Sequence, residues 1–210
     1  MQERNNYRKT LLAIFLASLA IFTTLAYVAT TPRPSEEFFQ IYVLGDDHRL
    51  EHYYPNDNST ISPHTIVRWY VGATNSMASA QYAILEFKLG NASIPAPNEN
   101  TATPSSAPIL VQYDRVLLQN ETWEFPFSWE IVGENQTGSA ISLEVNVNGT
   151  TIKMPNPITQ GGRNFRIFIE LWVYNPASNS VEFGWETGSQ RRAAWLQVWF
   201  NATTPALGTA

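Results

Sequence analysis

The first thirty residues set the strongest constraint on what this chain can fold into. Residues 10–31 form an unbroken apolar run without a charged side chain, and residues 1–9 before them are polar. A helix that crosses a bilayer needs about 20 apolar residues. We therefore expect a transmembrane signal-anchor helix over 10–31, in contact with the lipid bilayer. A linker (32–37), one further domain (38–202) and a frayed tail (203–210) are expected to follow.

The charges that flank the apolar run predict its orientation. Arg4, Arg8 and Lys9 precede the run, whereas Arg33 is the one basic residue close behind it. Basic flanks remain on the cytoplasmic side of a membrane. Residues 1–9 are therefore predicted to be cytoplasmic. The C-terminal domain is predicted to be extracellular, on a single-pass protein of the cell membrane.

A cleaved signal peptide is the alternative interpretation of the same run. Such peptides have a shorter apolar region of about 7–15 residues, followed by a small-x-small cleavage site. Here the run is longer, and cleavage after Ala29 would place the bulky Tyr27 three positions before the cut. The pattern favours an uncleaved anchor.

The composition of the chain excludes several kinds of site. There is no cysteine, which rules out disulfides, zinc–thiolate centres and cysteine nucleophiles. The 13 basic and 18 acidic residues leave a mild negative charge, with no basic patch that would bind nucleic acid. Aromatic residues make up 13% of the chain, which suits strands.

Apolar side chains alternate along the domain with the period of β-strands. Residues 123–131 alternate most clearly, although Pro126 cannot donate a ladder hydrogen bond and indicates an edge or a bulge. Asn148-Gly149 predicts a two-residue hairpin turn. Residues 165–174 are apolar on both faces apart from Arg166 and Glu170, as in a central strand. The expected strands are 39–44, 50–54, 65–73, 80–89, 110–118, 123–131, 141–147, 151–154, 165–174, 181–185 and 194–200.

Many short strands separated by turns, without a convincing soluble helix, predict the fold class. That class is all-β: an immunoglobulin-like antiparallel β-sandwich preceded by one N-terminal transmembrane α-helix. Residues 91–108 contain four prolines among Ser, Thr and Asn, and are predicted to form a mobile loop.

Six Asn-X-Ser/Thr sequons follow the apolar run, in or beside predicted turns. On an exported chain they are candidate acceptors of N-glycans. They are Asn58, Asn91, Asn120, Asn135, Asn148 and Asn201.

The aromatic residues of two strands are candidates for a contact surface. Trp195 and Trp199 share one strand face, and Trp172 and Tyr174 share another. Exposed aromatic surface binds sugar rings or a protein partner. A Trp-rich core is the alternative, and the sequence favours it.

The histidines and the paired acids do not predict a metal or catalytic site. His48 and His52 would lie about 13 Å apart in a strand at ~3.3 Å per residue, too far for one ion. Glycosidases need two acids about 5–9.5 Å apart across a cleft. Glu124 and Glu130 are too far apart within one strand, and the outward pair Glu182 and Glu186 has the ordinary pattern of a solvated sheet face. No catalytic residue, metal ligand or cofactor is predicted.

Three short motifs, in order along the chain, resemble a known family. They are Ile41-Tyr42-Val43-Leu44-Gly45 with Tyr54-Pro55; Val67-x-Trp69-x-Val71 with Asn75; and Phe168 to Leu171 followed by Arg191 or Arg192 and Trp195-Leu196-x-Val198. Together they resemble the soluble part of archaeal membrane proteins that carry the domain of unknown function numbered 1616, over about residues 38–200. The resemblance implies an archaeal cell surface and an immunoglobulin-like fold. It implies no established reaction and no catalytic residues.

One anchor, one sandwich and no motif for catalysis predict a non-enzymatic protein. We expect an interaction or accessory subunit of a membrane or cell-envelope assembly, with other membrane or envelope proteins as partners. A carbohydrate-binding surface module is the alternative. A pilus or thread subunit is disfavoured, because no acidic residue lies inside the apolar run.

Overall fold

The computed structural model describes residues 2–30, 37–137, 140–154, 159–160, 164–188 and 190–203. Two compact units divide the chain, residues 1–36 and 37–210, and each is described by itself.

The first unit contains one helix, α1 (Gln2–Thr30). Its segment Tyr7–Thr30 has a mean hydropathy of 2.3 and no buried residue, so it is long and apolar enough to cross a membrane. The hydroxyls of Thr23, Thr24 and Thr30 donate to carbonyls of the preceding turn, so these three donors are paired within the helix. These properties suit a membrane anchor and a signal sequence alike. The predicted apolar helix is confirmed, and its orientation stays a prediction.

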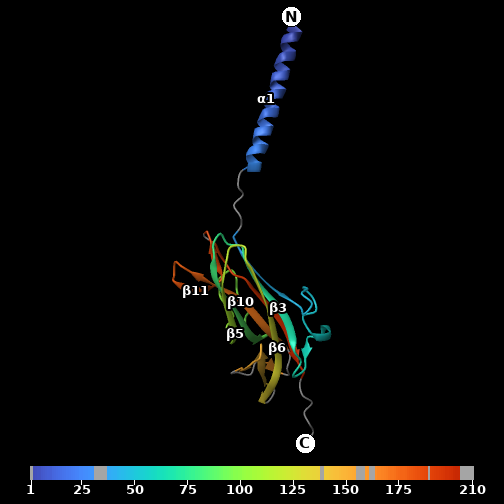
Figure 1. Cartoon of the computed structure of the whole chain (residues 1–210), viewed down its shortest axis with the longest axis vertical. Helices are drawn as coiled ribbons and strands as arrows, with labels where there is room; N and C mark the ends of the chain where they lie inside the picture. Colours follow the sequence, from blue (N-terminus) through green and yellow to red (C-terminus); the bar gives the residue numbers. More distant parts are fainter. Residues whose placement is uncertain are drawn as a thin grey trace. The chain divides into compact units, whose positions relative to one another are not determined.

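The second unit is a β-sandwich of two large sheets (Figure 1). The first sheet has the order β1-β3-β6-β7-β8, with β9 also paired to β7. Its strands are β1 (Phe39–Leu44), β3 (Val67–Asn75), β6 (Thr122–Thr137), β7 (Ala140–Val147), β8 (Thr150–Lys153) and β9 (Thr159–Gln160).

The second sheet has the order β2-β14-β10-β4-β5, with β11 also paired to β10. Its strands are β2 (Thr60–Ile61), β4 (Gln81–Asn91), β5 (Ile109–Leu117), β10 (Phe165–Asn175), β11 (Ser180–Phe183) and β14 (Trp195–Ala202). A small hairpin joins β12 (Trp185–Thr187) to β13 (Gln190–Arg192). The pairings within both large sheets are antiparallel except that of β2 with β14. The predicted immunoglobulin-like sandwich is confirmed.

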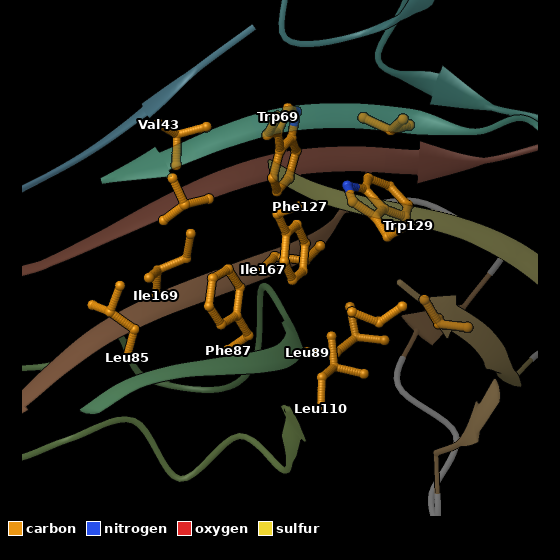
Figure 2. Packing of buried hydrophobic residues seen from close by; sticks show 14 of the residues in the cluster. Val43, Trp69, Leu85, Phe87, Leu89, Leu110, Phe127, Trp129, Ile167 and Ile169 are labelled. Carbon is orange, nitrogen blue, oxygen red and sulfur yellow. The ribbon is translucent and has the colours of Figure 1, made fainter. Parts of the chain in front are cut away.

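The core between the sheets is apolar and rich in aromatic rings (Figure 2). Phe87 of β4 stacks on Phe127 of β6, with ring centroids 4.2 Å apart, and so joins one sheet to the other. Trp69 and Trp129 are each 1% exposed beside this pair. The clear alternation in residues 123–131 arises because Phe127, Trp129 and their apolar neighbours face this layer.

Several local predictions are confirmed, each for the reason that suggested it. β10 lies between β4 and β14, as predicted for a central strand. Asn148 and Gly149 have φ of 47° and 87°, the left-handed values of the predicted tight turn. Pro126 lies in the half of β6 that pairs with β3 alone, because β7 pairs only from Trp129 onward. The missing N–H therefore disrupts no ladder.

The strand predicted over residues 50–54 is wrong. The chain forms turns from Gly45 onward and a 3₁₀ helix, η1 (Pro55–Asp57). His48, His52 and Asn56 have φ between 56° and 58°, in the left-handed region that a strand cannot contain. The few alternating apolar residues of this segment therefore lie in a loop.

Residues 92–108 form no strand, and a single β-bridge joins Asn98 to Thr103 in this loop. The loop lies against the outer face of the second sheet, where Ser105 and Ala107 are buried. These contacts hold its C-terminal part against the sheet, and the mobility predicted for residues 91–108 stays a prediction.

Candidate functional site: a groove beside two edge strands

Two edge strands of the sandwich lie close to each other, one from each sheet. β1 pairs with β3 on one side only, and β14 has β10 on one side with the short β2 covering just its last two residues, Asn201 and Ala202. Contacts between β1 and β14 place these edges on the same side of the domain.

The backbone of both edges points unpaired groups outward. Ser76 donates its N–H to the carbonyl of Phe38, so the alternation of an antiparallel ladder turns Phe39 and Ile41 away from β3. Leu171 donates to the carbonyl of Ala194, which by the same alternation turns Trp195 and its second neighbour Gln197 away from β10. Among the described residues, none hydrogen-bonds to these outward backbone groups.

A groove runs along these edges, with a volume of about 680 Å³. Phe39–Ile41 of β1 form one wall, Ala193–Trp195 form another, and residues 96–100 of the long loop form the third. A second hollow of about 430 Å³ shares Phe39 and Ala193 with the groove and extends it toward the β12–β13 hairpin. The space is an open trough of mixed polarity, in which apolar residues such as Trp195 lie beside polar ones such as Asn98 and Glu99.

The edges beside the groove carry no charge, unlike the edges on the other side. β1 reads FQIYVL and β14 reads WLQVWFNA. By contrast, β5 carries Asp114 and Arg115, and β8 carries Lys153. Charged side chains on an edge are a common protection against unwanted strand pairing. That protection is present on β5 and β8 and is missing beside the groove.

The arginine next to the groove brings together one of the two acid pairs considered from the sequence. Arg191 Nη1 lies 2.7 Å from Glu182 Oε2 and 3.7 Å from Glu186 Oε1. Hydrogen bonds from the Ser178 hydroxyl and from Arg191 lower the pKa of Glu182 to about 2. Both carboxylates thus contact the same guanidinium. This arrangement forms an ion pair and is not that of a general acid and base in hydrolysis.

Glu124 of the other acid pair is also occupied by neighbours. It accepts a hydrogen bond of 2.9 Å from the Tyr42 hydroxyl and lies 3.3 Å from His48 Nδ1. Burial and this carboxylate together raise the pKa of Tyr42 to about 12. Glu130 lies farther along β6, opposite Asn146.

The four aromatic candidates are separated from one another. Trp195 lines the groove. Trp172 is half-buried and donates its indole N–H to Glu170. Trp199 is 40% exposed, but the Arg166 guanidinium covers its ring at 4.7 Å, and Tyr174 is bonded to Asn179. Of the four candidates, Trp195 is therefore the one that lines the groove, while Tyr174 lines a separate and smaller hollow beside Trp185.

The sequons differ in how free their amides are. Asn58, Asn120 and Asn135 are exposed, while Asn91 and Asn201 are half-buried. Asn148 is exposed, but its Nδ2 donates to the Tyr113 hydroxyl at 2.6 Å, and a glycan on that nitrogen would have to replace this bond. Modification of all six stays a prediction.

The histidine segment is arranged differently from what the sequence suggested. Because residues 50–54 form a loop, the separation estimated for a strand does not apply, and His52 instead bonds Asp57 at 2.7 Å. Ligand atoms of Asp47, Glu51 and His52 lie within 4.8 Å of one another, all exposed. Arg49 already lies 3.7 Å from Asp47 and 3.3 Å from Glu51, so a cation is in place among these acids.

Sequence reasoning missed a buried charged cluster on the outer face of the second sheet. Glu86 and Lys88 lie on the strand face opposite Leu85 and Phe87, together with Glu170 of β10, and the three are only 7%, 4% and 0% exposed. The one indication of this cluster in the sequence was Glu170, a charged residue within a strand that is otherwise largely apolar on both faces. The long loop that covers the cluster could not be placed from its composition.

The chain matches no family model and no curated protein. The resemblance to the domain of unknown function 1616 stays a prediction. Among solved structures it is similar to a CARDB domain from Pyrococcus furiosus determined with di-metal ions: 8% identity, a TM-score of 0.37, 83% of this chain and 95% of that one.

Two further solved structures have similarly low sequence identities and TM-scores. The C-terminal domain of Wzt has 9% identity and a TM-score of 0.35, with 86% of each chain covered. A β-glucosidase from Listeria innocua in complex with gluconolactone has 12% identity and a TM-score of 0.33, over 81% of this chain and 17% of the enzyme.

Proposed function

We propose that this protein is a membrane-anchored, non-catalytic interaction subunit whose extracellular sandwich binds an extended segment of a partner protein. The segment adds as a strand to the free edge of β1, within the groove. The single observation that carries the proposal is the trough of about 680 Å³ beside an uncharged edge whose outward backbone groups are unpaired.

Strand addition fits the chemistry of this site. Main-chain hydrogen bonds to the edge supply affinity, and pockets for alternate side chains supply specificity. The outward N–H and C=O groups of Phe39 and Ile41 are the groups that would form the main-chain hydrogen bonds. The apolar wall from Ala193 to Trp195 would form the pockets for the side chains. The partner segment is therefore extended, with an apolar side chain at every second position.

The membrane assignment rests on α1 and its flanks. A helix of this length and hydropathy, with three basic residues before its apolar run, supports an N-terminus in the cytoplasm and the sandwich outside. The proposed partner is another membrane or envelope protein, since the anchor confines the domain to that surface.

The test begins with a photo-crosslinking side chain at Gln40, an exposed residue of the groove, in the full chain in its native membrane. Mass spectrometry of the adduct identifies the partner segment, which is then synthesised as a peptide. Binding of that peptide to the purified full chain should protect the amides of Phe39 and Ile41 from hydrogen exchange.

A proline variant separates strand addition from simple contact. Ile41→Pro removes an N–H that the ladder to β3 does not use, so the fold should remain while peptide affinity falls roughly tenfold or more, as expected for lost main-chain hydrogen bonds. Thr151→Pro is the matched control, because it removes an outward N–H from the charged edge of β8. Equal affinity of the wild type and Ile41→Pro, or crosslinks to folded surfaces alone, would refute the proposal.

Carbohydrate binding is a second candidate for the same groove. Trp195 lies beside the polar side chains of Asn98, Glu99 and Asn100, a combination that sugar rings also use. Titration with oligosaccharides, followed by tryptophan fluorescence, would show a saturable change that Trp195→Ala abolishes. No response in the wild type would dismiss this candidate.

A further inference from the structure

Three charged side chains meet beneath the long loop, with almost no contact with solvent. Lys88 Nζ lies 2.6 Å from Glu170 Oε2 and 3.2 Å from Glu86 Oε2. Lys88 and Glu86 are on β4, and Glu170 is on the adjacent β10, where it pairs with Glu86 in register. Side chains of this kind are rarely so completely buried unless they are paired.

The charges of this cluster do not balance when every group is ionised. One ammonium faces two carboxylates, and no described cation other than Lys88 contacts either acid. Burial raises the pKa of Glu170, which favours its neutral acid form. The Trp172 ring lies 5.3 Å from Lys88 Nζ, in a cation–π contact with the ammonium form of the lysine. Transfer of a proton from the amine to a carboxylate removes charge from this site.

The oxygens of Glu170 are held as the two oxygens of a reacting carboxyl group would be. The backbone N–H of Ser105 donates to Oε1 at 2.7 Å, as an oxyanion donor does. The other oxygen, Oε2, is the one that faces Lys88 Nζ, and it also receives the Trp172 indole N–H at 3.3 Å.

Glu86 is placed to move protons. Its Oε1 accepts a hydrogen bond from Gln112, which fixes the carboxylate. Its Oε2 is buried, accepts no hydrogen bond from any residue that the structure describes, and lies within reach of Lys88 Nζ. A buried acceptor left without a hydrogen bond is costly, and it marks a group available as a base.

We propose that Lys88 and Glu170 join in an intramolecular isopeptide bond, with Glu86 as the proton shuttle. The Nζ atom of neutral Lys88 attacks Cδ of protonated Glu170, and the N–C bond forms. Glu86 takes a proton from the nitrogen and passes it to the departing Oε2, so that the C–Oε2 bond breaks and one water leaves. The retained oxygen, Oε1, stays on the Ser105 N–H. The step needs no oxidant, cofactor or metal.

Such a bond would perform the task that disulfides perform in other exported domains. It would link β4 to β10, the central pair of the second sheet, across 82 residues of chain. The protein has no cysteine with which to make a disulfide. A cross-link that closes a long loop limits the unfolded ensemble and so resists unfolding.

Intact mass spectrometry of the full chain tests the proposal directly. The chain is expressed in a host without N-glycosylation and purified in mild detergent, and its proteolytic peptides are sequenced as well. The expected product is lighter than the sequence mass by about 18 Da, one water, with a branched peptide that joins Lys88 to Glu170. A folded wild type at its full sequence mass would overturn the proposal.

Variants separate the bond from the fold. Glu86→Gln keeps the shape and the hydrogen bond to Gln112 but cannot take a proton, so it should fold and remain at full mass. Lys88→Met should also remain at full mass. Lys153→Met, which changes an exposed lysine 3.7 Å from Glu144, should still lose one water. Loss of water in Lys88→Met would place the bond elsewhere and refute the assignment, and loss of water in Glu86→Gln would refute the shuttle.

Discussion

The sandwich has two buried layers, and they differ in chemistry. The layer between the sheets is made of apolar and aromatic side chains such as Phe87 and Phe127. The layer between the second sheet and loop 91–108 contains charged and polar groups, chiefly Arg166 and Glu170, beside the buried ring of Phe168. Both exclude solvent, but only the first does so without the cost of desolvating charge.

The difference shows what each layer contributes. The apolar layer supplies the bulk of the folding free energy through burial of area. The polar layer directs one particular segment, the long loop, to one place on the sheet, because each of its hydrogen bonds needs a specific partner. Stability and placement are thus supplied by different faces of the same strands.

The largest effect should come from breaking the apolar layer. Phe127→Ala removes a ring that is 1% exposed and stacks on Phe87 across the sheets. We expect a loss of about 3–5 kcal/mol in the free energy of unfolding, from lost transfer energy plus the cavity that remains. Urea unfolding followed by tryptophan fluorescence measures it. Val116→Ala, at a side chain 56% exposed on β5, should change the same quantity by less than about 0.5 kcal/mol.

A smaller and more local effect should follow when the polar layer is broken. Arg166 donates to the carbonyls of Asn91 and Ile94, and its guanidinium lies 4.4 Å from the Phe168 ring. Arg166→Met keeps the apolar stem but loses these bonds, at a cost of about 1–3 kcal/mol.

Hydrogen exchange shows whether the Arg166→Met effect is confined to the loop. Amides of residues 91–96 should exchange faster while those of β10 stay protected. Arg115→Met is the control, since Arg115 forms an exposed pair with Glu121 and should cost less than about 1 kcal/mol. Uniformly faster exchange across the domain would show that Arg166 supports the whole fold and not the loop's position.

The two layers also mark how far the sequence could predict this protein. The pattern of apolar residues predicted the apolar layer, because within residues 123–131 and 165–174 the residue types alone indicate which side chains face the core. The polar layer depends on where a loop without periodicity lies, and nothing local in residues 91–108 specifies that position. Nothing local to Glu86 and Lys88 therefore predicts that they are buried.

The groove could not be predicted from the sequence either, because it too depends on where distant segments lie relative to one another. Trp195 was identified as a candidate contact residue, but a groove needs the relative placement of β1, β14 and the loop tip. Pairing order is a long-range property, set by contacts between residues far apart in the chain. The strand predicted over residues 50–54 was wrong for a local reason instead. The apolar residues alternate there, but residues with left-handed backbone angles, such as His52, form a loop.

The smallest expected effect concerns a charge outside both layers. Hydrogen bonds from Ser178 and Arg191 lower the pKa of Glu182 to about 2, below its ordinary value. A depressed carboxyl pKa stabilises the fold above the ordinary value, and the contribution is lost as the pH falls through about 2. The carboxyl group is near the surface, so solvent and salt weaken the effect.

A pH titration followed by NMR of the Glu182 side chain measures that shift. The midpoint should lie near 2 in the wild type and return toward the ordinary glutamate value in Arg191→Met. Glu182→Gln should flatten the acid limb of the stability curve slightly, while Glu99→Gln, for which no ion pair is recorded among the described residues, should leave it unchanged. A wild-type midpoint at the ordinary value would mean that Arg191 does not hold Glu182 in solution. Arg191 would then keep only Glu186 and the Phe183 carbonyl as partners, and a partner segment with an acidic residue at that end of the groove would bind it more tightly.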